Sequence, residues 1–360
     1  MLVHICCSVD SHYFLQKLQA DYPDEKLIGF FYDPNIHPYS EYYLRLLDVK
    51  RSCAMLGVEL VVGEYDVAGW LESVRGLEHE PEKGARCKVC FDNRFETSAK
   101  EASKRGEKLF TSTLLTSPKK SLAQLQKSGD EVAAKYGVTF VAPDYRKASG
   151  TQEQNLLAKQ ASLYRQDYCG CLYGLRDQRH HQNKPLDELF VPLSNQILPD
   201  SLEAKIALYE RRLELENEGK SYQIIKQRFL NYRLLYGYIK NKQGTIPSYF
   251  LPYSSIRGDY SRGKIEYAIE NVHYFNRDEV KFITLEHYNA LAQCDYASIQ
   301  DLCYHPPKFE EELTVRTQIS QTPYDLGAII VVEAIPTTKL EILCQSKLYE
   351  DMQEVLIELS

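Results

Sequence analysis

Six of the ten cysteines stand in three close pairs, and their thiols are the groups of this chain best suited to metal or redox chemistry. The pairs are Cys6 with Cys7, Cys87 with Cys90, and Cys169 with Cys171. A short spacing lets two sulfurs face one centre, and thiolates are the usual ligands of iron–sulfur clusters. Because zinc sites and thioredoxin-like redox pairs share the Cys-x-x-Cys spacing, one pair alone decides little. Three pairs in one half of the chain predict a metal centre.

Asp10 follows Cys7 by three residues and has two interpretations. It is either a hard oxygen ligand for an iron beside the cysteines or the N-cap of a following helix, and spacing alone favours the cap. His4 precedes the cysteines within an apolar strand, so we expect a hydrogen-bonded core histidine. Cys53 lies on the apolar stripe of a predicted helix, so we expect it in the core.

Basic residues near the cysteines are candidates for balancing the charge of a metal centre or for binding phosphate. Arg86 and Arg94 flank the Cys-x-x-Cys motif, and Lys119 and Lys120 form a local basic cluster further along the chain. A solvated helix face is an equally good interpretation of each cluster taken alone.

The charge and composition are those of an ordinary water-soluble protein. The net charge is −7, but the first 180 residues carry 24 basic and 24 acidic side chains, whereas the remainder carries 19 and 26. The first half is therefore neutral, and a nucleic-acid partner is not excluded. We expect no signal peptide and no membrane span, because the chain begins without a basic segment and its apolar runs are short. These features predict a cytoplasmic protein with reduced cysteines.

The elements that must position the cysteines alternate between short apolar strands and amphipathic helices in the first half. This alternation is typical of a Rossmann-like, mostly parallel sheet with helices on both faces. Such sheets bind ligands at the carboxyl ends of their strands, and Cys6 and Cys7 end the first predicted strand. No phosphate-binding glycine motif follows that strand, so cysteines stand where a nucleotide-binding fold places glycines.

A linker-like segment near Gln178 predicts two domains. We expect a metallocluster-binding catalytic domain over residues 1–178 and a C-terminal α+β domain of unknown role over residues 179–360. In the second domain, long helices are predicted near 201–218 and 222–242, followed by short strands and a final helix near 347–357.

The first half also resembles a known family, the epoxyqueuosine reductase QueH family, over about residues 1–176. The second half lies beyond the matching segments, so nothing is transferred to it. The matching segments are His4-Ile-Cys-Cys7 with Asp10, Tyr32-Asp-Pro-Asn-Ile-His-Pro38 with Glu41, Glu80-Pro-Glu-Lys-Gly-Ala-Arg-Cys87 with Cys90 and Arg94, Phe110-Thr-Ser-Thr-Leu-Leu115 with Ser117, Pro118 and Lys120, Asp144-Tyr-Arg-Lys147 with Gly150, Leu163-Tyr-Arg-Gln166, and Tyr168-Cys-Gly-Cys171.

The resemblance implies a HUP-type sheet, a [4Fe–4S] cluster, and a second iron or a redox-active dithiol beside the cluster. It also implies a two-electron deoxygenation of epoxyqueuosine to queuosine at the wobble position of tRNA, the last step of queuosine synthesis. A cluster passes one electron at a time, so a second centre is needed. We expect the cluster on Cys6, Cys7, Cys87 and Cys90, and the second, catalytic centre on Cys169, Cys171 and Asp10.

The implied partners are a tRNA with a queuosine-type wobble base and an unidentified electron donor. The wobble nucleotide must be splayed out of the anticodon loop to reach a buried centre. Tyr168 and His37 are weak candidates for the proton donor. Two alternatives remain. A cluster-containing tRNA sulfur-transfer enzyme would need a phosphate loop for ATP, and a zinc-stabilised binding module would have no catalytic role.

Overall fold

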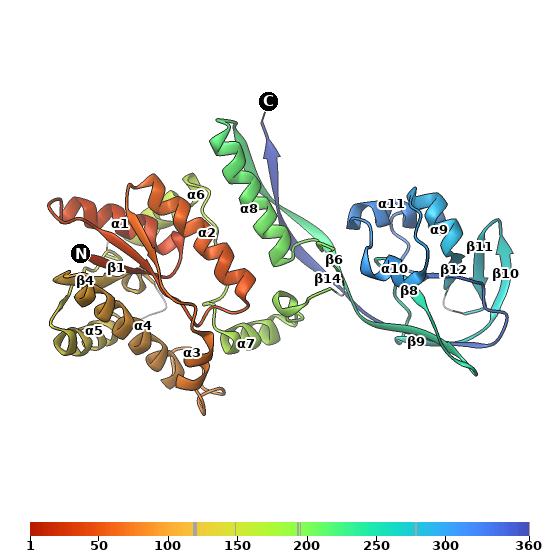
Figure 1. Cartoon of the computed structure of the whole chain (residues 1–360), viewed down its shortest axis with the longest axis horizontal. Coiled ribbons are helices and arrows are strands. Elements are labelled where there is room, and N and C mark those ends of the chain that lie inside the picture. The colour runs from red at the N-terminus through yellow and green to blue at the C-terminus, as the bar shows by residue number, and fades with distance from the viewer. Residues whose placement is uncertain (118–120, 148, 193, 195, 278, 360) are drawn as a thin grey trace. The chain divides into compact units, whose positions relative to one another are not determined.

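The computed structural model describes residues 1–117, 121–147, 149–192, 194, 196–277 and 279–359 and divides the chain into two compact units (Figure 1). Unit 1 contains Met1–Leu189 and Tyr209–Glu218, and unit 2 contains Phe190–Leu208 and Gly219–Ser360. The roles predicted for the segments 1–178 and 179–360 remain predictions. Within the described residues, no helix combines the length and the hydropathy that crossing a bilayer requires.

Unit 1 is built on a five-stranded parallel sheet in the order β3-β2-β1-β4-β5, which confirms the predicted fold class. The strand order reverses at β1, because β2 lies on one side of it and β4 on the other. This reversal is the switch point at which open α/β sheets bind ligands. The strands are β1 (Leu2–Ile5), β2 (Ile28–Phe31), β3 (Glu59–Val62), β4 (Leu109–Ser112) and β5 (Thr139–Phe140).

Helices cover both faces of this sheet. Figure 1 shows α1, α2 and α6 on one side of it and α4 and α5 on the other. The bounds are α1 (Ser8–Asp21), α2 (Tyr39–Met55), α3 (Val67–Ser73), α4 (Ala85–Lys104), η1 (Thr113–Thr116), α5 (Leu122–Tyr136), α6 (Gly150–Gln160), α7 (Leu172–Gln182) and η2 (Asp187–Leu189).

The central strands carry apolar residues on both faces because helices cover both. His4 is the polar exception in β1, and it is fully buried. Its Nδ1 lies 2.8 Å from the Ser112 hydroxyl and its Nε2 lies 3.1 Å from the Tyr32 carbonyl oxygen. Both ring nitrogens therefore have partners, which confirms His4 as a core histidine. Cys53 is buried in the same core, also as predicted.

A buried ion pair joins α8 (Leu202–Asn217) to the rest of unit 1. Arg212 donates to the Asp48 carboxylate over 2.7 Å, and both side chains are fully buried. Asp48 also accepts hydrogen bonds from the Ser8 hydroxyl and, at 2.8 Å, from the Tyr164 backbone N–H. A buried carboxylate with three donors is well compensated, so this network joins α2 to three other segments of the chain.

Unit 2 contains two long strands where two of its helices were predicted. The helix predicted near 201–218 is confirmed as α8, but the segments near 222–242 and 347–357 are β6 (Tyr222–Asn241) and β14 (Leu340–Glu358). These two strands pair antiparallel along almost their whole length, from Tyr222 with Glu358 to Lys240 with Glu341. Ile, Tyr and Leu fit either a helix stripe or a pleated strand, and a pairing partner more than a hundred residues away decides between them.

Two sheets and three helices complete unit 2, in agreement with the predicted α+β class. One sheet has the order β7-β6-β14-β9 and the other has the order β10-β11-β12-β13-β8. The remaining bounds are β7 (Gly244–Ile246), β8 (Ser248–Phe250), β9 (Tyr260–Gly263), β10 (Ile265–Ile269), β11 (Val272–Phe275), β12 (Lys281–Thr284), β13 (Ile329–Val332), α9 (Leu285–Ala292), α10 (Ile299–Tyr304) and α11 (Phe309–Ser320).

Glu312 on α11 gives unit 2 a predictable pH dependence. The side chain is fully buried, and its carboxylate accepts a hydrogen bond of 2.7 Å from the Gln196 amide. Burial raises the pKa of Glu312 to about 7, against hydrogen bonds from Tyr249, Gln196 and Tyr288 that lower it. Because the folded pKa lies above the unfolded value, this group's contribution to stability is complete below pH ~4.5 and is lost as the pH rises through about 7.

The wild-type protein should become less stable between pH 5 and pH 8 as Glu312 ionises. Glutamine cannot ionise, so we expect Glu312→Gln to lose less stability over the same range. The difference in free energy of unfolding between wild type and variant should shift by roughly 2–3 kcal/mol over that range. Urea unfolding at both pH values measures it. Exposed Glu310 provides the control, and equal pH profiles for wild type and Glu312→Gln would contradict the assignment.

Candidate metal centre

A cavity of about 220 Å³ in unit 1 gathers five of the six paired cysteines. Cys6 directly follows β1, Asn35 lies in the loop after β2, and Leu114 lies in η1 after β4. The cavity therefore opens at the carboxyl ends of the strands that flank the switch point, where a parallel sheet leaves its ligand crevice. The five cysteines are Cys6, Cys87, Cys90, Cys169 and Cys171.

Cys6, Cys7 and Asp10 form the tightest group of potential metal ligands among the described residues. Their ligand atoms all lie within 4.8 Å of one another. The Cys6 sulfur lies 3.9 Å from the Cys7 sulfur and 3.6 Å from Asp10 Oδ2. Cys7 is the N-cap residue of α1, and Asp10 lies in the first turn. The N-cap interpretation of Asp10 is therefore wrong, because the helix starts two residues earlier and its first turn aims the carboxylate at the sulfurs.

The electrostatics of this group fit a bound cation. The pKa of Cys7 is raised well above its usual value by its hydrogen bond with Cys6, by burial and by the charge of Asp10. Burial raises the pKa of Asp10, and hydrogen bonds with Cys7, Cys6 and Gln154 oppose this shift. Two thiols and a carboxylate gathered this closely are ligands that a positive metal ion stabilises, so the donor set fits iron or zinc.

The other two cysteine pairs approach each other from the starts of two helices. Cys87 and Cys90 lie in the first turns of α4, and Cys171 is the N-cap residue of α7. Burial raises the pKa of Cys90, as do nearby Cys169 and Cys87, whereas Arg94 and the Trp70 indole lower it. Helix N-termini favour thiolates through their dipoles and free N–H groups.

The loop with Cys169 is held tightly against this group. The pKa of Cys171 is raised by its hydrogen bond with Cys169, by burial and by the Cys169 charge. A Cβ atom on Gly174 would lie 3.1 Å from the Cys169 sulfur, so glycine leaves room for this sulfur. Arg45 donates to the carbonyl oxygens of Tyr168 (3.0 Å) and Cys169 (3.3 Å). Sequence reasoning missed Arg45, whose role depends on a loop more than a hundred residues away.

The two arginines beside the Cys-x-x-Cys motif are buried. Arg94 makes a 2.8 Å ion pair with Asp33, and Arg86 donates to the carbonyl oxygens of Leu77 and Glu78. Burial lowers the pKa of Arg94, but Cys90, Asp33 and Cys6 raise it further, so this guanidinium stays charged. Their positions in the cavity wall suit charge balance better than contact with phosphate. Lys119 and Lys120 lie outside the described residues.

The two candidate proton donors are poorly placed for that role. The Tyr168 hydroxyl donates to the His37 carbonyl oxygen over 2.7 Å, and burial and Glu41 raise the pKa of Tyr168 far above its usual value. Burial lowers the pKa of His37, which keeps its ring neutral. Tyr168 lines the cavity, but its proton is already engaged.

Two side-chain oxygens in the cavity wall lack a partner among the described residues. Asn35 Oδ1 and Gln166 Oε1 are buried from solvent and accept no hydrogen bond from protein atoms. A buried oxygen without a donor costs about 1–3 kcal/mol, so such atoms are typical of sites that a ligand completes. Neither residue could be singled out from sequence, since an unsatisfied atom is visible only in the folded structure.

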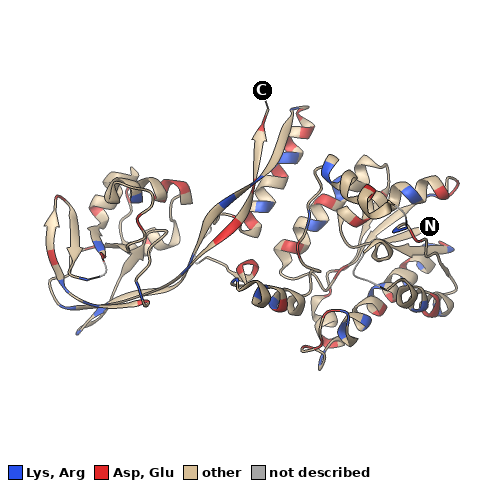
Figure 2. Ribbon diagram, turned by 180° about the vertical axis from the view of Figure 1, so that it is seen from behind, with Lys and Arg blue, Asp and Glu red and all other residues tan. Residues whose placement is uncertain are grey.

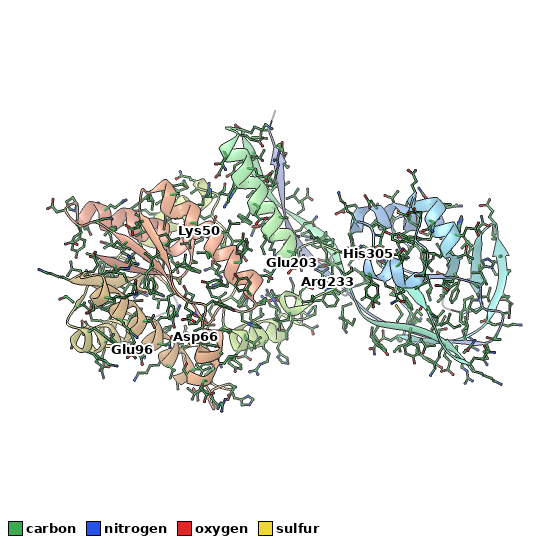
Figure 3. All side chains as sticks on the ribbon, viewed as in Figure 1. Lys50, Asp66, Glu96, Glu203, Arg233 and His305 are labelled. Atoms are coloured by element: carbon green, nitrogen blue, oxygen red, sulfur yellow. The ribbon has the colours of Figure 1, made fainter. Side chains whose placement is uncertain are left out.

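The helix α3 carries the aromatic part of the wall. Asp66, labelled in Figure 3, caps this helix by accepting a 2.8 Å hydrogen bond from the Gly69 backbone N–H. The cap fixes the helix that bears Trp70, whose buried indole packs with Cys90 and Cys171. An apolar wall of this kind shields Cys90 and Cys171 from water and lowers the dielectric constant around them.

Comparison with known proteins identifies the family. A family profile described as "Epoxyqueuosine reductase QueH" matches residues 1–177. A Helicobacter pylori protein named epoxyqueuosine reductase QueH is 39% identical over 346 residues, covering 92% of this chain and 94% of its own. The protein of that name from Thermotoga maritima is 35% identical over 182 residues, covering 50% of this chain and 92% of its own. The Helicobacter pylori match thus extends into the half that the family profile does not reach.

Among solved structures, the U34-tRNA thiolase NcsA from Methanococcus maripaludis with its [4Fe-4S] cluster is similar at a TM-score of 0.34 and 15% identity, covering 59% of this chain and 73% of its own. The identification depends instead on the sequence relatives. With a relative 39% identical over 92% of its length, this chain belongs to the epoxyqueuosine reductase QueH family.

Proposed function

We propose that this protein is an iron–sulfur epoxyqueuosine reductase that converts epoxyqueuosine to queuosine at the wobble position of tRNA. The observation that supports this most strongly is the cavity at the carboxyl ends of β1, β2 and β4, where five cysteines meet in a chain of this family. A substrate in tRNA also places the enzyme in the cytoplasm.

The reaction sets what the cavity must provide. Both epoxide C–O bonds break, a C=C bond forms, and the oxygen leaves as water after taking up two electrons and two protons. A cluster and a second metal centre would supply the electrons and polarise the epoxide oxygen. The protein's own residues would bind the substrate, exclude bulk water and balance the charge of the centre, with Arg45, Arg86 and Arg94 as buried cations in the cavity wall.

The contacts favour a division of ligands that differs from the one expected from sequence. Asp10 lies with Cys6 and Cys7, within 4.8 Å, whereas sequence reasoning grouped it with Cys169 and Cys171. We propose that Cys6, Cys7 and Asp10 hold a single metal ion. The other four cysteines line the same cavity, form the second ligand set and would hold the [4Fe–4S] cluster: Cys87, Cys90, Cys169 and Cys171.

This proposal is tested first by the cofactor and then by the product. Anaerobically purified protein should be brown and contain iron and acid-labile sulfide. tRNA from a strain that lacks the gene should accumulate epoxyqueuosine, and the purified protein with a chemical reductant should convert it to queuosine. Colourless protein with stoichiometric zinc would instead support a zinc-stabilised binding module, and sulfur incorporation into tRNA would support a sulfur-transfer enzyme.

The oxygen of Asn35 gives the proposal a specific test in the substrate pocket. We expect Asn35→Ala to lower kcat/KM about tenfold, because a hydrogen bond from a substrate hydroxyl or N–H group is lost. The free energy of unfolding should stay equal or rise, since the substitution removes a buried oxygen that has no partner among the described residues.

Steady-state kinetics and urea unfolding of Asn35→Ala check both expectations, with iron content measured alongside. Asn155→Ala, an exposed asparagine on α6, is the control. Unchanged kcat/KM with full cofactor content would show that Asn35 does not contact substrate.

A further inference from the structure

The sheet β7-β6-β14-β9 of unit 2 presents a face of tyrosines bordered by cations. Paired residues on neighbouring strands place their side chains next to one another, so the side chains of this face form three rows that run across the strands. Tyr236 is opposite Gln345, and Leu343 lies between Tyr238 and Tyr260. Side chains alternate between the faces of a strand, and Ile239, Ile342 and Ser261 are the buried residues of the opposite face.

Two of the three tyrosines are exposed and Tyr238 is half-buried, although aromatic side chains usually lie inside. Tyr236 is 56% exposed and Tyr260 is 45% exposed. The ring centroids of Tyr236 and Tyr238 lie 5.8 Å apart, and Tyr260 stands two strands away from Tyr238, roughly 10 Å across the sheet. Rings at this spacing present separate platforms for planar groups.

Lysine and arginine side chains lie beside these tyrosines, at the end of the sheet where β6 turns into β7. The third row places Lys240 and Arg262 on either side of Glu341, which lies 3.0 Å from the lysine and 3.6 Å from the arginine. Lys240 also lies 5.6 Å from the centroid of the Tyr238 ring. The row thus contains two positive side chains and one carboxylate, so its net charge is positive.

Three further lysines stand at the same end of the sheet. Lys264 continues the alternation of Tyr260 and Arg262, and Lys339 precedes Leu340, which pairs with Gly263. Lys242 lies in the turn that follows Asn241, and that asparagine donates to the Thr338 hydroxyl over 3.3 Å. Figure 2 shows Lys and Arg at the end of the sheet where β6 turns into β7. The acidic total of the second half therefore hides a local positive patch.

We propose that this face, made of Tyr236, Tyr238, Tyr260 and the cations around them, binds a single-stranded segment of RNA. Exposed aromatic rings on a sheet stack with bases, and cations at its edge meet the phosphates. A protein partner would be favoured by a larger apolar area without the cations. The inference deepens the proposed function, because the reductase must hold a tRNA and this face supplies contacts outside the metal cavity.

The test is RNA binding by the full chain, measured separately from turnover. The probe is a fluorescein-labelled single-stranded RNA of about twelve nucleotides, a length on the order of one single-strand binding site, followed by anisotropy at several KCl concentrations. We expect the double variant Tyr236→Ala, Tyr260→Ala to bind at least tenfold more weakly, since each stacked base is lost with its ring. The corresponding Phe variants should bind like wild type, because phenylalanine also stacks.

Further variants test the contribution of the cations to RNA binding and the specificity of the effect for the tyrosines of this face. Replacing Arg262 and Lys264 by Gln should reduce the slope of log affinity against log salt by about 1–2. Tyr324→Ala removes a tyrosine that is 87% exposed outside this sheet and should have no effect. Wild-type affinity in the double Ala variant, equal losses in the Ala and Phe variants, or an equal loss in Tyr324→Ala would each overturn the proposal.

The outcome is distinguishable from a failure of the reductase proposal. If the protein binds RNA through these tyrosines but produces no queuosine, the RNA-binding proposal is supported and the reductase function is refuted. A chain that makes queuosine with the same KM for tRNA when Tyr236 and Tyr260 are Ala refutes the face alone.

Discussion

Cys90→Ser is expected to leave the protein without its iron–sulfur cluster and to abolish reductase activity. Cys90 is buried, packs against the Trp70 indole and lines the cavity together with Cys87 and Cys169. It belongs to the cluster's ligand set under either division of the sulfurs. A serine hydroxyl is a poor substitute, because it ionises only far above neutral pH and lacks the softness that iron–sulfur chemistry requires. Iron and sulfide analysis after anaerobic purification, with the visible absorption spectrum, measures the loss.

Two further variants make this experiment decisive. Cys53→Ser replaces a cysteine buried in the α2 core, so it should keep the cluster and lose only packing free energy, on the order of 1 kcal/mol. Asp10→Asn should keep the cluster absorption but lose one equivalent of metal, because Asp10 groups with Cys6 and Cys7. Retention of a full cluster in Cys90→Ser would contradict the site. Loss of the cluster in Asp10→Asn would contradict both divisions of the ligands, because each places Asp10 at the second centre.

Arg212→Ala should be the most destabilising single substitution in the helix α8. Arg212 and Asp48 are both fully buried, so removal of the guanidinium leaves a carboxylate without its counter-charge in a dry environment. Breaking a buried ion pair in this way costs about 3–5 kcal/mol. The Arg212 guanidinium also donates to the Ser162 carbonyl oxygen over 2.8 Å, and that contact is lost too.

Urea unfolding of wild type and Arg212→Ala, followed by circular dichroism, measures the difference. Arg211 is the matched control, because it is the preceding residue on α8 but is exposed and pairs with surface carboxylates. Arg211→Ala should change the free energy of unfolding by less than about 1 kcal/mol. If Arg212→Ala has as small an effect, the network around Asp48 does not hold α8 to unit 1.

The parallel sheet of unit 1 and its cysteine-bearing loops could be predicted because their signals are local. Apolar strands such as Leu2–Ile5 and the stripes of the helices between them are read within a few residues. The end of a parallel strand predicts a place in the ligand crevice, and Cys6, which directly follows β1, lines the cavity at that edge of the sheet. The same apolar strand predicts a core position for His4, and its two hydrogen bonds confirm this.

Three predictions failed because the local sequence pattern was ambiguous: two helices and one N-cap. The residues of β6 and β14 repeat Ile, Leu and Tyr in a way that suits a helix stripe, but each strand supplies the other's backbone hydrogen bonds across the chain. Asp10 has the residue type of an N-cap, but α1 begins at Ser8, so its carboxylate faces sulfur instead of backbone N–H groups. A helix start is uncertain by one or two residues from sequence, and that shift changes a side chain's direction.

What the sequence determined by itself was the chemistry available: three pairs of thiols, the family they mark, and the edge of the sheet at which the first pair stands. What only the tertiary structure decided was which of these groups meet. Cys169 lines the same cavity as Cys90 in a loop that Arg45 on α2 holds, and Asp10 joins Cys6 because of where α1 starts. Residue type and spacing act along the chain, whereas a metal site depends on distances between segments that only packing brings together.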